Sequence, residues 1–428
     1  MLDKLPLIST KEPSSVSFSA EFAQLIPGTS NIVDGEGTSY IDDFENSATP
    51  FALNKPLSWS LAATPQGVSA FQGSGPRGQN DFRGKLAWYS IDNLFYLSDN
   101  RRPDGISSDE LENHYVRAVE QQEIFANRDL NIINFQQVFD LAFYPNERGQ
   151  YNYNTNLDTE GNLNFDPRRS WGGITNAIRS EVDFNKANVE YIEFWLMDPF
   201  IQSTRGVIDD GRPNPTPNTT GGDLYFNLGS ISEDIIPDGR HGFENGLPPD
   251  GDKSEGVILD PAWGYVTTEP FLTNAFDNDP DSRSNQDVGL DGATDEEELL
   301  IFDDFLNDLG PARIAVQDDP SADNFSYFLG SEQDQADATL LERYKNFNGL
   351  ENNSPVISGN EAFTPSGTVV PDNEDLNVDN TLSELEEYYE YRIPIRPAAD
   401  GGIEQNEFIV DRITNNINGD EVTWYLYR

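Results

Sequence analysis

The twelve residues from Asp375 to Glu386 have the composition and spacing of a calcium-binding loop. Such a loop carries short acids or amides at its first, third and fifth positions and a glutamate at its twelfth. Asp375, Asn377 and Asp379 occupy the first three of these positions, and Glu386 occupies the last. Thr381, at the seventh position, would contribute its backbone carbonyl. The chemistry predicted for this loop is therefore binding of Ca²⁺, which prefers hard oxygen ligands.

The same stretch also has a purely structural interpretation. Asn380 stands where calcium loops normally carry glycine, although Asn is among the few residues that tolerate the left-handed conformation. No clear helix precedes the loop, so the pattern does not support a paired helix–loop–helix calcium module. The alternative to a calcium site is an acidic turn that caps the segment beginning at Ser383.

A second acidic loop, residues 287–295, is another candidate site for the same ion. Its three aspartates are spaced four residues apart, and Gly289 and Gly292 between them allow tight bends. The alternative is a solvated turn in which Thr294 or Asp295 caps the helix that follows. In either loop a bound cation would have a structural role, because loops this acidic repel themselves. The candidate ligands are Asp287, Asp291 and Asp295.

Groups typical of nucleophilic catalysis are scarce in this chain. It has no cysteine and two histidines, His114 and His241. Cysteine nucleophiles, zinc–thiolate sites and disulfides are thereby excluded, and two isolated histidines argue against a Ser-His-Asp triad. With 75 Asp and Glu residues, no pair of carboxylates stands out as the acid and base of a glycosidase. We therefore expect a protein that is not an enzyme, with His114 on a helix face and His241 in a surface loop.

The composition is that of a globular but strongly acidic chain. Its 428 residues include 27 Lys and Arg against 75 Asp and Glu, which gives a net charge of −48, and 26 Phe and 17 Tyr argue against simple disorder. A field of this sign repels phosphate backbones, so we expect no nucleic-acid partner. The charge suits a solvated extracellular or periplasmic surface, or one that collects divalent cations. No apolar run approaches the ~20 residues of a membrane helix, and the first residues lack the apolar centre of a signal peptide.

The elements expected to position these loops are mainly strands. Between Asn188 and Ile235, two apolar and aromatic runs are separated by a loop rich in Pro, Gly, Asn and Thr. Side chains around Trp195 in the first run and Phe226 in the second alternate between two faces, which is the period of a strand. Because both faces are largely apolar, we predict that the two runs are adjoining inner strands of a β-sandwich.

Three helices are predicted beside these strands. The longest covers residues 107–127, where Ser107 as N-cap and Glu110 three residues later form a capping box. A short helix is expected from about Asp295, and another within residues 336–349.

The predicted fold is mainly β, with three parts. Residues 1–272 are expected to form a jelly-roll-like (galactose-binding-like) β-sandwich domain, into which the helix near 107–127 is inserted. Residues 273–358 form an insertion of acidic loop and short helices, and residues 359–428 begin a second β-sheet domain. Because the chain ends inside a predicted strand, we expect both of its ends to be cuts within a longer protein.

Several long blocks of the sequence, in order along nearly the whole chain, resemble the SprA/Sov family. This family comprises giant outer-membrane translocons of type IX secretion that also serve gliding motility. The blocks are LISTKEPSSVSFSAEFAQLIPG, YIDDFENSATPFAL, PLSWSLAATP, RRSWGGITNAI, VEYIEFWLMDPF, GGDLYFNLGSISEDIIPDGRHGFENGLP, NAFDNDPDSRSNQDVGLDG, ERYKNFNGLENNSP and EQNEFIVDRI.

The resemblance implies a role in protein export across the outer membrane. Members of the family form a very large single-chain β-barrel with extramembrane insertions, and they are several times longer than this chain. The chain is therefore expected to be an internal slice, mostly insertion, at the outer membrane or cell surface. Its implied partners are secreted cargo proteins, other secretion-system components and, through the missing barrel portions, the outer membrane.

A second likeness covers three short blocks. YIDDFE, VEYIEFWLMDP and DLYFNL resemble strands of carbohydrate-binding, galactose-binding-like jelly-roll modules. Trp59, Trp88 and Trp171 would then form an aromatic platform for a sugar, the alternative being that these rings lie in the core. The alternative function is accordingly a cell-surface carbohydrate-binding module.

Overall fold

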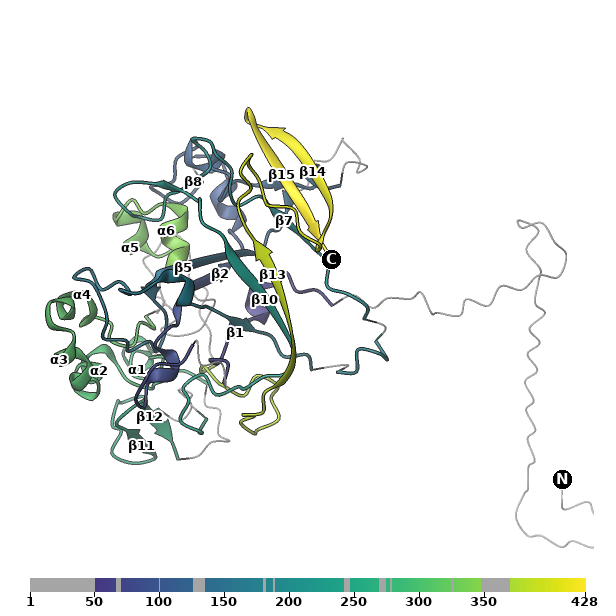
Figure 1. Ribbon diagram of the computed structural model, residues 1–428. Coiled ribbons are helices and arrows are strands. Elements are labelled where there is room, and N and C mark those ends of the chain that lie inside the picture. Colours follow the sequence, from purple (N-terminus) through teal and green to yellow (C-terminus); the bar gives the residue numbers. More distant parts are fainter. Residues whose placement is uncertain are drawn as a thin grey trace, which may run out of the picture. The chain divides into compact units, whose positions relative to one another are not determined.

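The computed structural model describes residues 51–66, 71–99, 101–125, 135–179, 182–187, 189–241, 247–268, 275–277, 279–324, 327–347 and 370–428. The chain divides into two units, Met1–Thr49 and Pro50–Arg428. The first unit lies outside the described residues, as do the sequence blocks predicted within it. All elements given below belong to the second unit (Figure 1).

The described strands form seven separate antiparallel sheets. The one sheet of three strands has the order β14 (Ile409–Ile417), β15 (Asp420–Tyr427), β7 (Phe194–Met197). The longest two-stranded sheets pair β10 (Gly222–Ser230) with β13 (Glu387–Ile395) and β2 (Gly84–Tyr89) with β5 (Asp140–Arg148). The shorter pairs are β1 (Ser60–Leu61) with β6 (Ile174–Thr175), β3 (Val119–Glu120) with β4 (Phe135–Gln136), β8 (Val207–Ile208) with β9 (Thr216–Pro217), and β11 (Val257–Asp260) with β12 (Gly264–Thr267).

The helices of the described residues are short and gather between residues 280 and 345. They are α1 (Pro280–Arg283), α2 (Asp295–Ile301), α3 (Asp303–Asp308), α4 (Arg313–Val316), α5 (Ser331–Gln335) and α6 (Leu340–Lys345). The helix predicted from about Asp295 is confirmed as α2, and the one predicted within residues 336–349 is confirmed as α6. Both begin with a capping box, Thr294 with Glu297 and Thr339 with Glu342. None of the described helices is long and apolar enough to cross a membrane.

The predicted strands around Trp195 and Phe226 exist as β7 and β10, but the prediction that they adjoin in one sheet is wrong. β7 pairs with β15, and β10 pairs with β13 along its whole length (Figure 1). The two strands meet instead through side chains, with the rings of Phe194 and Phe226 5.7 Å apart in an apolar cluster that both sheets share. The mainly β class is confirmed, while a jelly-roll order of strands does not emerge among the described residues.

The predicted helix over residues 107–127 is also wrong. The segment contains two single 3₁₀ turns, η5 (Glu110–Glu112) and η6 (Gln121–Glu123), and the short strand β3. Its start follows the prediction, because the Ser107 hydroxyl accepts a hydrogen bond from the Glu110 N–H. The helix then stops at Asn113, whose side-chain oxygen accepts from the Tyr115 N–H, while the His114 N–H donates to the Arg205 carbonyl. These alternative partners replace the helical hydrogen bonds.

The three predicted domain ranges stay a prediction, but strands from the last range share sheets with strands from the first. β13 is paired with β10, and β15 with β7. The C-terminal strands are therefore packed as part of the same compact unit as the strands near residues 194–230.

Candidate metal centre

Two acidic loops that are separated in sequence by α2, α3 and α4 meet in the interior. The first, residues 287–294, leads into α2, and the second, residues 318–324, follows α4. The capping box at the start of α2 fixes its first turn, because the Glu297 carboxylate accepts from the Thr294 N–H at 2.9 Å. Asp295 and Glu298 are three residues apart on this turn and so lie on one face of the helix.

The first loop can approach the second only because it carries a glycine. Gly289 has a φ of +87°, and a Cβ at this position would lie 2.2 Å from Oδ2 of Asp323. Any side chain here would therefore collide with the carboxylate as well as strain the backbone. The second loop also bends through the left-handed region, at Ala322, with a φ of +56°.

Ser321 links the two loops by hydrogen bonds. Its hydroxyl donates to Oδ2 of Asp291 at 2.5 Å, and its N–H donates to Oε2 of Glu298 at 2.9 Å. Its carbonyl accepts from the Tyr151 N–H at 2.7 Å. Ser321, Asp291 and Glu298 are all buried, so these contacts are held away from water and fix the positions of both carboxylates.

Five carboxylates converge around these contacts in two groups that share Glu298. In each group one oxygen of every residue lies within 4.8 Å of the others. One group is buried throughout, and the other is partly exposed. The buried group is Asp291, Glu298 and Asp323, and the partly exposed group is Asp295, Glu298 and Asp319.

Asp323 has the least compensated position of the five. The residue is 1% exposed, and neither of its carboxylate oxygens has a donor at normal hydrogen-bond geometry in the described part of the chain. The Tyr151 hydroxyl, which accepts from the Leu290 N–H at 2.9 Å, lies close enough to lower the pKa of this carboxyl by a weak hydrogen bond, but burial and the charges of the neighbouring acids outweigh it. A buried carboxylate in this state is costly unless it is protonated or meets a cation.

Burial and mutual repulsion raise the pKa values of these acids. Burial raises the pKa of Asp291 to about 7, and burial together with the charges of Asp291 and Asp319 raises the pKa of Glu298 to about 10. Burial raises the pKa of Asp323 well above its ordinary value, with Asp291 and Glu298 adding to the effect. The cluster therefore resists full ionisation at neutral pH when nothing positive lies within it.

Two positive side chains lie near the cluster without entering it. The half-buried Arg148 donates its hydrogen bonds to the backbone carbonyls of Asn152, Asp319 and Pro320. Lys253 is paired with Glu297 and also donates to the Gly292 carbonyl. Glu297 belongs to neither group, so the charge of Lys253 is used outside the five carboxylates. Arg148 alone does not balance these five acids.

The structure separates the three aspartates predicted as ligands in this region. Asp291 lies in the buried group and Asp295 in the partly exposed one. Asp287 lies in neither group, because its carboxylate accepts hydrogen bonds from the Arg283 guanidinium at 3.1 and 3.2 Å. The prediction of a metal site here thus keeps two of its three residues.

Glu298, Asp319 and Asp323 were missed by the prediction from sequence. A signal for Glu298 was present, since residues 287–298 form a run of twelve with Gly292 at its sixth position and Glu298 at its twelfth. This is the spacing of a calcium loop, although Gly289 replaces the usual acid or amide at the third position. Asp319 and Asp323 had no such signal, because they come from a different loop.

The other predicted calcium loop is closed by backbone donors. Asp375 accepts from the N–H groups of Asp379 and Asn380 at 3.1 and 2.8 Å, and Asp379 accepts from the Thr381 N–H at 2.8 Å. Asn380 has the expected left-handed conformation, with a φ of +64°. Among the described residues these side chains do not form a group of three carboxylates close enough to share an ion.

The remaining predicted ligands of that loop face other partners. The side chain of Asn377 accepts from the Asp379 N–H at 2.8 Å, and Glu386 accepts from the Gln66 N–H at 2.8 Å. Calcium binding at this loop stays a prediction.

Two glutamates that the sequence did not single out hold this loop to residues 233–236. Glu233 accepts from the N–H groups of Leu376, Asn377 and Ser383. In the opposite direction, the fully buried Glu374 accepts from the N–H groups of Ile235 and Ile236 at 2.7 and 2.8 Å. The pairing is reciprocal, so the loop is held by hydrogen bonds at both of its sides.

We expect Glu374→Ala to destabilise the chain by about 3 kcal/mol, because it leaves two buried N–H groups without an acceptor. Urea unfolding would measure the loss, with Glu390→Ala, at an exposed glutamate of β13, as the control that changes stability by less than about 0.5 kcal/mol. Equal stability of the two variants would show that these hydrogen bonds do not hold the loop.

The aromatic platform predicted for a sugar does not form from the three tryptophans. Trp88 is fully buried. Trp59 stacks on Phe139 with ring centroids 6.2 Å apart, and the Arg83 guanidinium covers Trp171 at 4.7 Å from its ring centroid. In these three cases the ring faces are used inside the fold, as the alternative prediction of core tryptophans requires.

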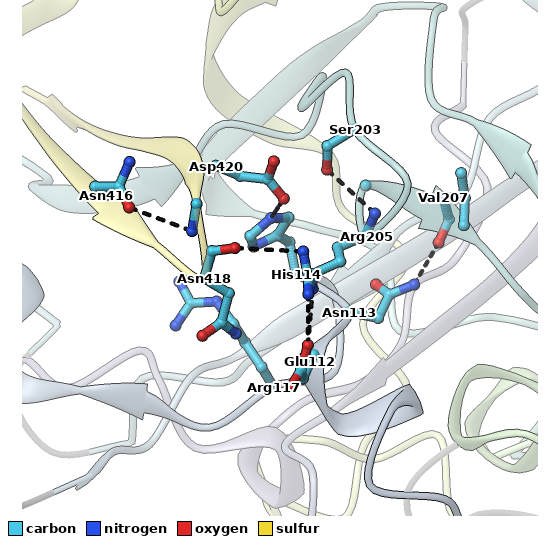
Figure 2. A network of polar contacts seen from close by, with 12 residues as sticks. Glu112, Asn113, His114, Arg117, Ser203, Arg205, Val207, Asn416, Asn418 and Asp420 are labelled. Carbon is cyan, nitrogen blue, oxygen red and sulfur yellow. Dashed lines mark hydrogen bonds and ion pairs between the residues drawn. The ribbon is translucent and has the colours of Figure 1, made fainter.

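His114 lies buried in a polar network that ties the segment after η5 to the turn between β14 and β15 (Figure 2). Its Nε2 is 3.0 Å from Oδ2 of Asp420, and this contact lowers the pKa of the Asp420 carboxyl. Arg205 contacts both segments, because it donates to Glu112 of η5 at 2.9 Å and to the carbonyl of Asn418, in the turn between β14 and β15, at 3.3 Å. The predicted helix-face position of His114 is wrong, and the residue instead anchors the C-terminal hairpin.

The part of the chain that carries this hairpin matches a known class of proteins. A family described as motility related/secretion protein, SprA_N, matches residues 304–428, which include α4 to α6 and the strands β13, β14 and β15. The match confirms the resemblance of the chain to the SprA/Sov family and associates it with motility and secretion at the cell envelope. A search of curated proteins gave no match.

Proposed function

We propose that this chain is an extramembrane portion of an outer-membrane translocon for type IX protein secretion and gliding motility, with a structural and transport role and no catalysis. The observation that carries the proposal is the family match over residues 304–428. The matched strands β13 and β15 pair with β10 and β7, so the part with a family likeness is built into the same sheets as the part before it.

The surface chemistry supports a role beside a path for exported proteins. The net charge of −48 keeps a chain soluble and disfavours non-specific adhesion of other acidic proteins. Apolar side chains of β7 and β10, among them Phe194 and Phe226, pack in one cluster that holds the two sheets together. A part of a translocon beside which many cargo proteins move needs a rigid interior and a surface that does not bind them.

The carbohydrate-binding alternative has less support. Among the tryptophans proposed for it, Trp88 is buried and the faces of Trp59 and Trp171 are occupied by Phe139 and Arg83.

The test is made in a bacterium that carries this chain within its own secretion machinery. We expect crosslinking of a tagged copy to recover secretion components and cargo, and deletion of residues 304–428 from the chromosomal copy to stop cargo reaching the medium. Deleting an unrelated surface protein is the control. Normal secretion and motility by the deletion strain would overturn the proposal, and glycan binding that is lost in Trp59→Ala would favour the carbohydrate alternative.

A further inference from the structure

We propose that Asp291, Glu298 and Asp323 bind one Ca²⁺ ion, which joins the loop before α2 to the loop after α4. All three side chains are buried, and one oxygen of each lies within 4.8 Å of the others. Two oxygens on opposite sides of a Ca²⁺ ion, each about 2.4 Å from it, are about 4.8 Å apart. The three carboxylates are therefore placed so that a single ion can contact all of them.

Asp323 distinguishes this group from an ordinary acidic cluster. At 1% exposure, with no donor at normal hydrogen-bond geometry to either oxygen in the described part of the chain and only a weak contact with the Tyr151 hydroxyl, it faces two other buried acids. Acidic clusters at a surface satisfy their oxygens with water, but this carboxylate is excluded from water. A cation between Asp323, Asp291 and Glu298 compensates the unpartnered oxygens and the mutual repulsion together.

The ligand chemistry selects a hard cation, and calcium among the hard cations. The group offers carboxylate oxygens without imidazole or thiolate, which disfavours Zn²⁺ and Cu²⁺. Mg²⁺ requires near-octahedral geometry at about 2.0–2.1 Å and usually keeps several waters. Ca²⁺ accepts six to eight oxygens in irregular geometry, and three carboxylates can supply up to six.

The loop pattern supports the same ion from a different direction. Residues 287–298 have the glycine and the terminal glutamate of a calcium loop, at Gly292 and Glu298. Asp287 stands at the first position of that pattern, but its carboxylate accepts a hydrogen bond from Arg283. Asp323 from the second loop supplies the missing carboxylate, so the site is assembled only when both loops are folded.

The test is a calcium titration by isothermal calorimetry of the whole chain after its metal has been removed with EDTA. We expect Asp323→Asn to bind one Ca²⁺ fewer than the wild-type chain, or to bind it at least about tenfold more weakly. Glu296→Gln is the matched control, because Glu296 is an exposed acid of the same helix and belongs to neither group. It should titrate as the wild type does.

A second measurement uses the luminescence of a bound lanthanide in place of the heat of binding. Tb³⁺ substitutes for Ca²⁺, and Tyr151, whose hydroxyl is hydrogen-bonded in this loop, should sensitise its luminescence when the tyrosines are excited. Luminescence that calcium displaces is expected in the wild type and in Glu296→Gln, and it should be lost in Asp323→Asn and Asp291→Asn. Circular dichroism in EDTA verifies that each variant is folded.

Two results would overturn the assignment. A wild-type chain that gives neither heat nor a rise in melting temperature with millimolar CaCl₂ has no such site. An Asp323→Asn variant that is folded and binds calcium as the wild type does would place the ion elsewhere, with the loop from Asp375 to Glu386 as the next position to test. Neither result bears on the secretion role, which does not depend on this ion.

Discussion

In EDTA at pH 8, the Glu298→Gln variant is expected to be more stable than the wild-type chain by about 3 kcal/mol. Glu298 is shared by both carboxylate groups. Burial and the neighbouring acids raise its pKa to about 10, so at pH 8 the folded chain must hold a proton on Glu298 that the unfolded chain releases. Gln has the same shape without the charge, and its side-chain oxygen can still accept from the Ser321 N–H as Glu298 does. The substitution therefore removes the cost of holding this proton and keeps the hydrogen bond that links the two loops.

The pH dependence of this difference follows from the pKa of Glu298, which rises from 4.5 to about 10 on folding. Between these values the folded chain keeps a proton that the unfolded chain releases. The contribution of this group to stability is thus fully present below pH 4.5 and is lost as the pH rises toward 10. The neutral Gln has no such loss, so the advantage of Glu298→Gln should be near zero at pH 4.5 and grow toward pH 9. Urea unfolding at several pH values measures it.

Calcium should remove or reverse this advantage. The wild-type chain gains about 2.7 kcal/mol when the ion is present at 100 times its dissociation constant, whereas Glu298→Gln has lost a ligand and gains less. Glu296→Gln, at an exposed acid of the same helix, should follow the wild type under both conditions. A Glu298→Gln variant that is less stable than the wild type in EDTA at pH 8 would show that the metal-free cluster does not raise the pKa of Glu298.

The candidate site shows which parts of a structure a sequence can predict. Thr294, Glu297 and the start of α2 follow from signals within a few residues, and the structure confirms them. The same local pattern indicated Asp291 and Asp295, and its twelfth position would have added Glu298. Asp323 could not be predicted in this way, because its place beside Asp291 depends on how α3 and α4 return the chain.

The strands likewise show that a local pattern predicts an element but not the element with which it pairs. Period-two alternation correctly predicted β7 and β10, because it depends only on which faces of a strand are apolar. It could not predict which strands pair, since β13 and β15 alternate in the same manner and are the ones that bind β10 and β7. In the segment after Ser107 the capping signal was real, but contacts of Asn113 and His114 with distant residues prevented a helix.

The second large effect is expected at the buried ion pair of Arg117 and Glu123. Their side chains are 5% and 6% exposed, and two hydrogen bonds of 2.7 Å join the guanidinium to the carboxylate. Glu123 also accepts from the Trp424 indole N–H at 3.3 Å. The pair thereby connects the chain near β3 to β15, within the part that matches the secretion family.

We expect Glu123→Ala to destabilise the chain by about 3–5 kcal/mol, because it leaves the Arg117 guanidinium buried without a counter-charge. Replacing both residues, as Glu123→Leu with Arg117→Met, should cost much less than the single change, since no charge is then left in the core. A double-mutant cycle measures the coupling: urea unfolding gives the stability of the wild type, of Glu123→Leu, of Arg117→Met and of the variant with both changes. If the double variant is as unstable as the sum of the single variants, the two residues act independently, and the hairpin of β14 and β15 is held mainly by its apolar contacts with Ile124 and Ile201.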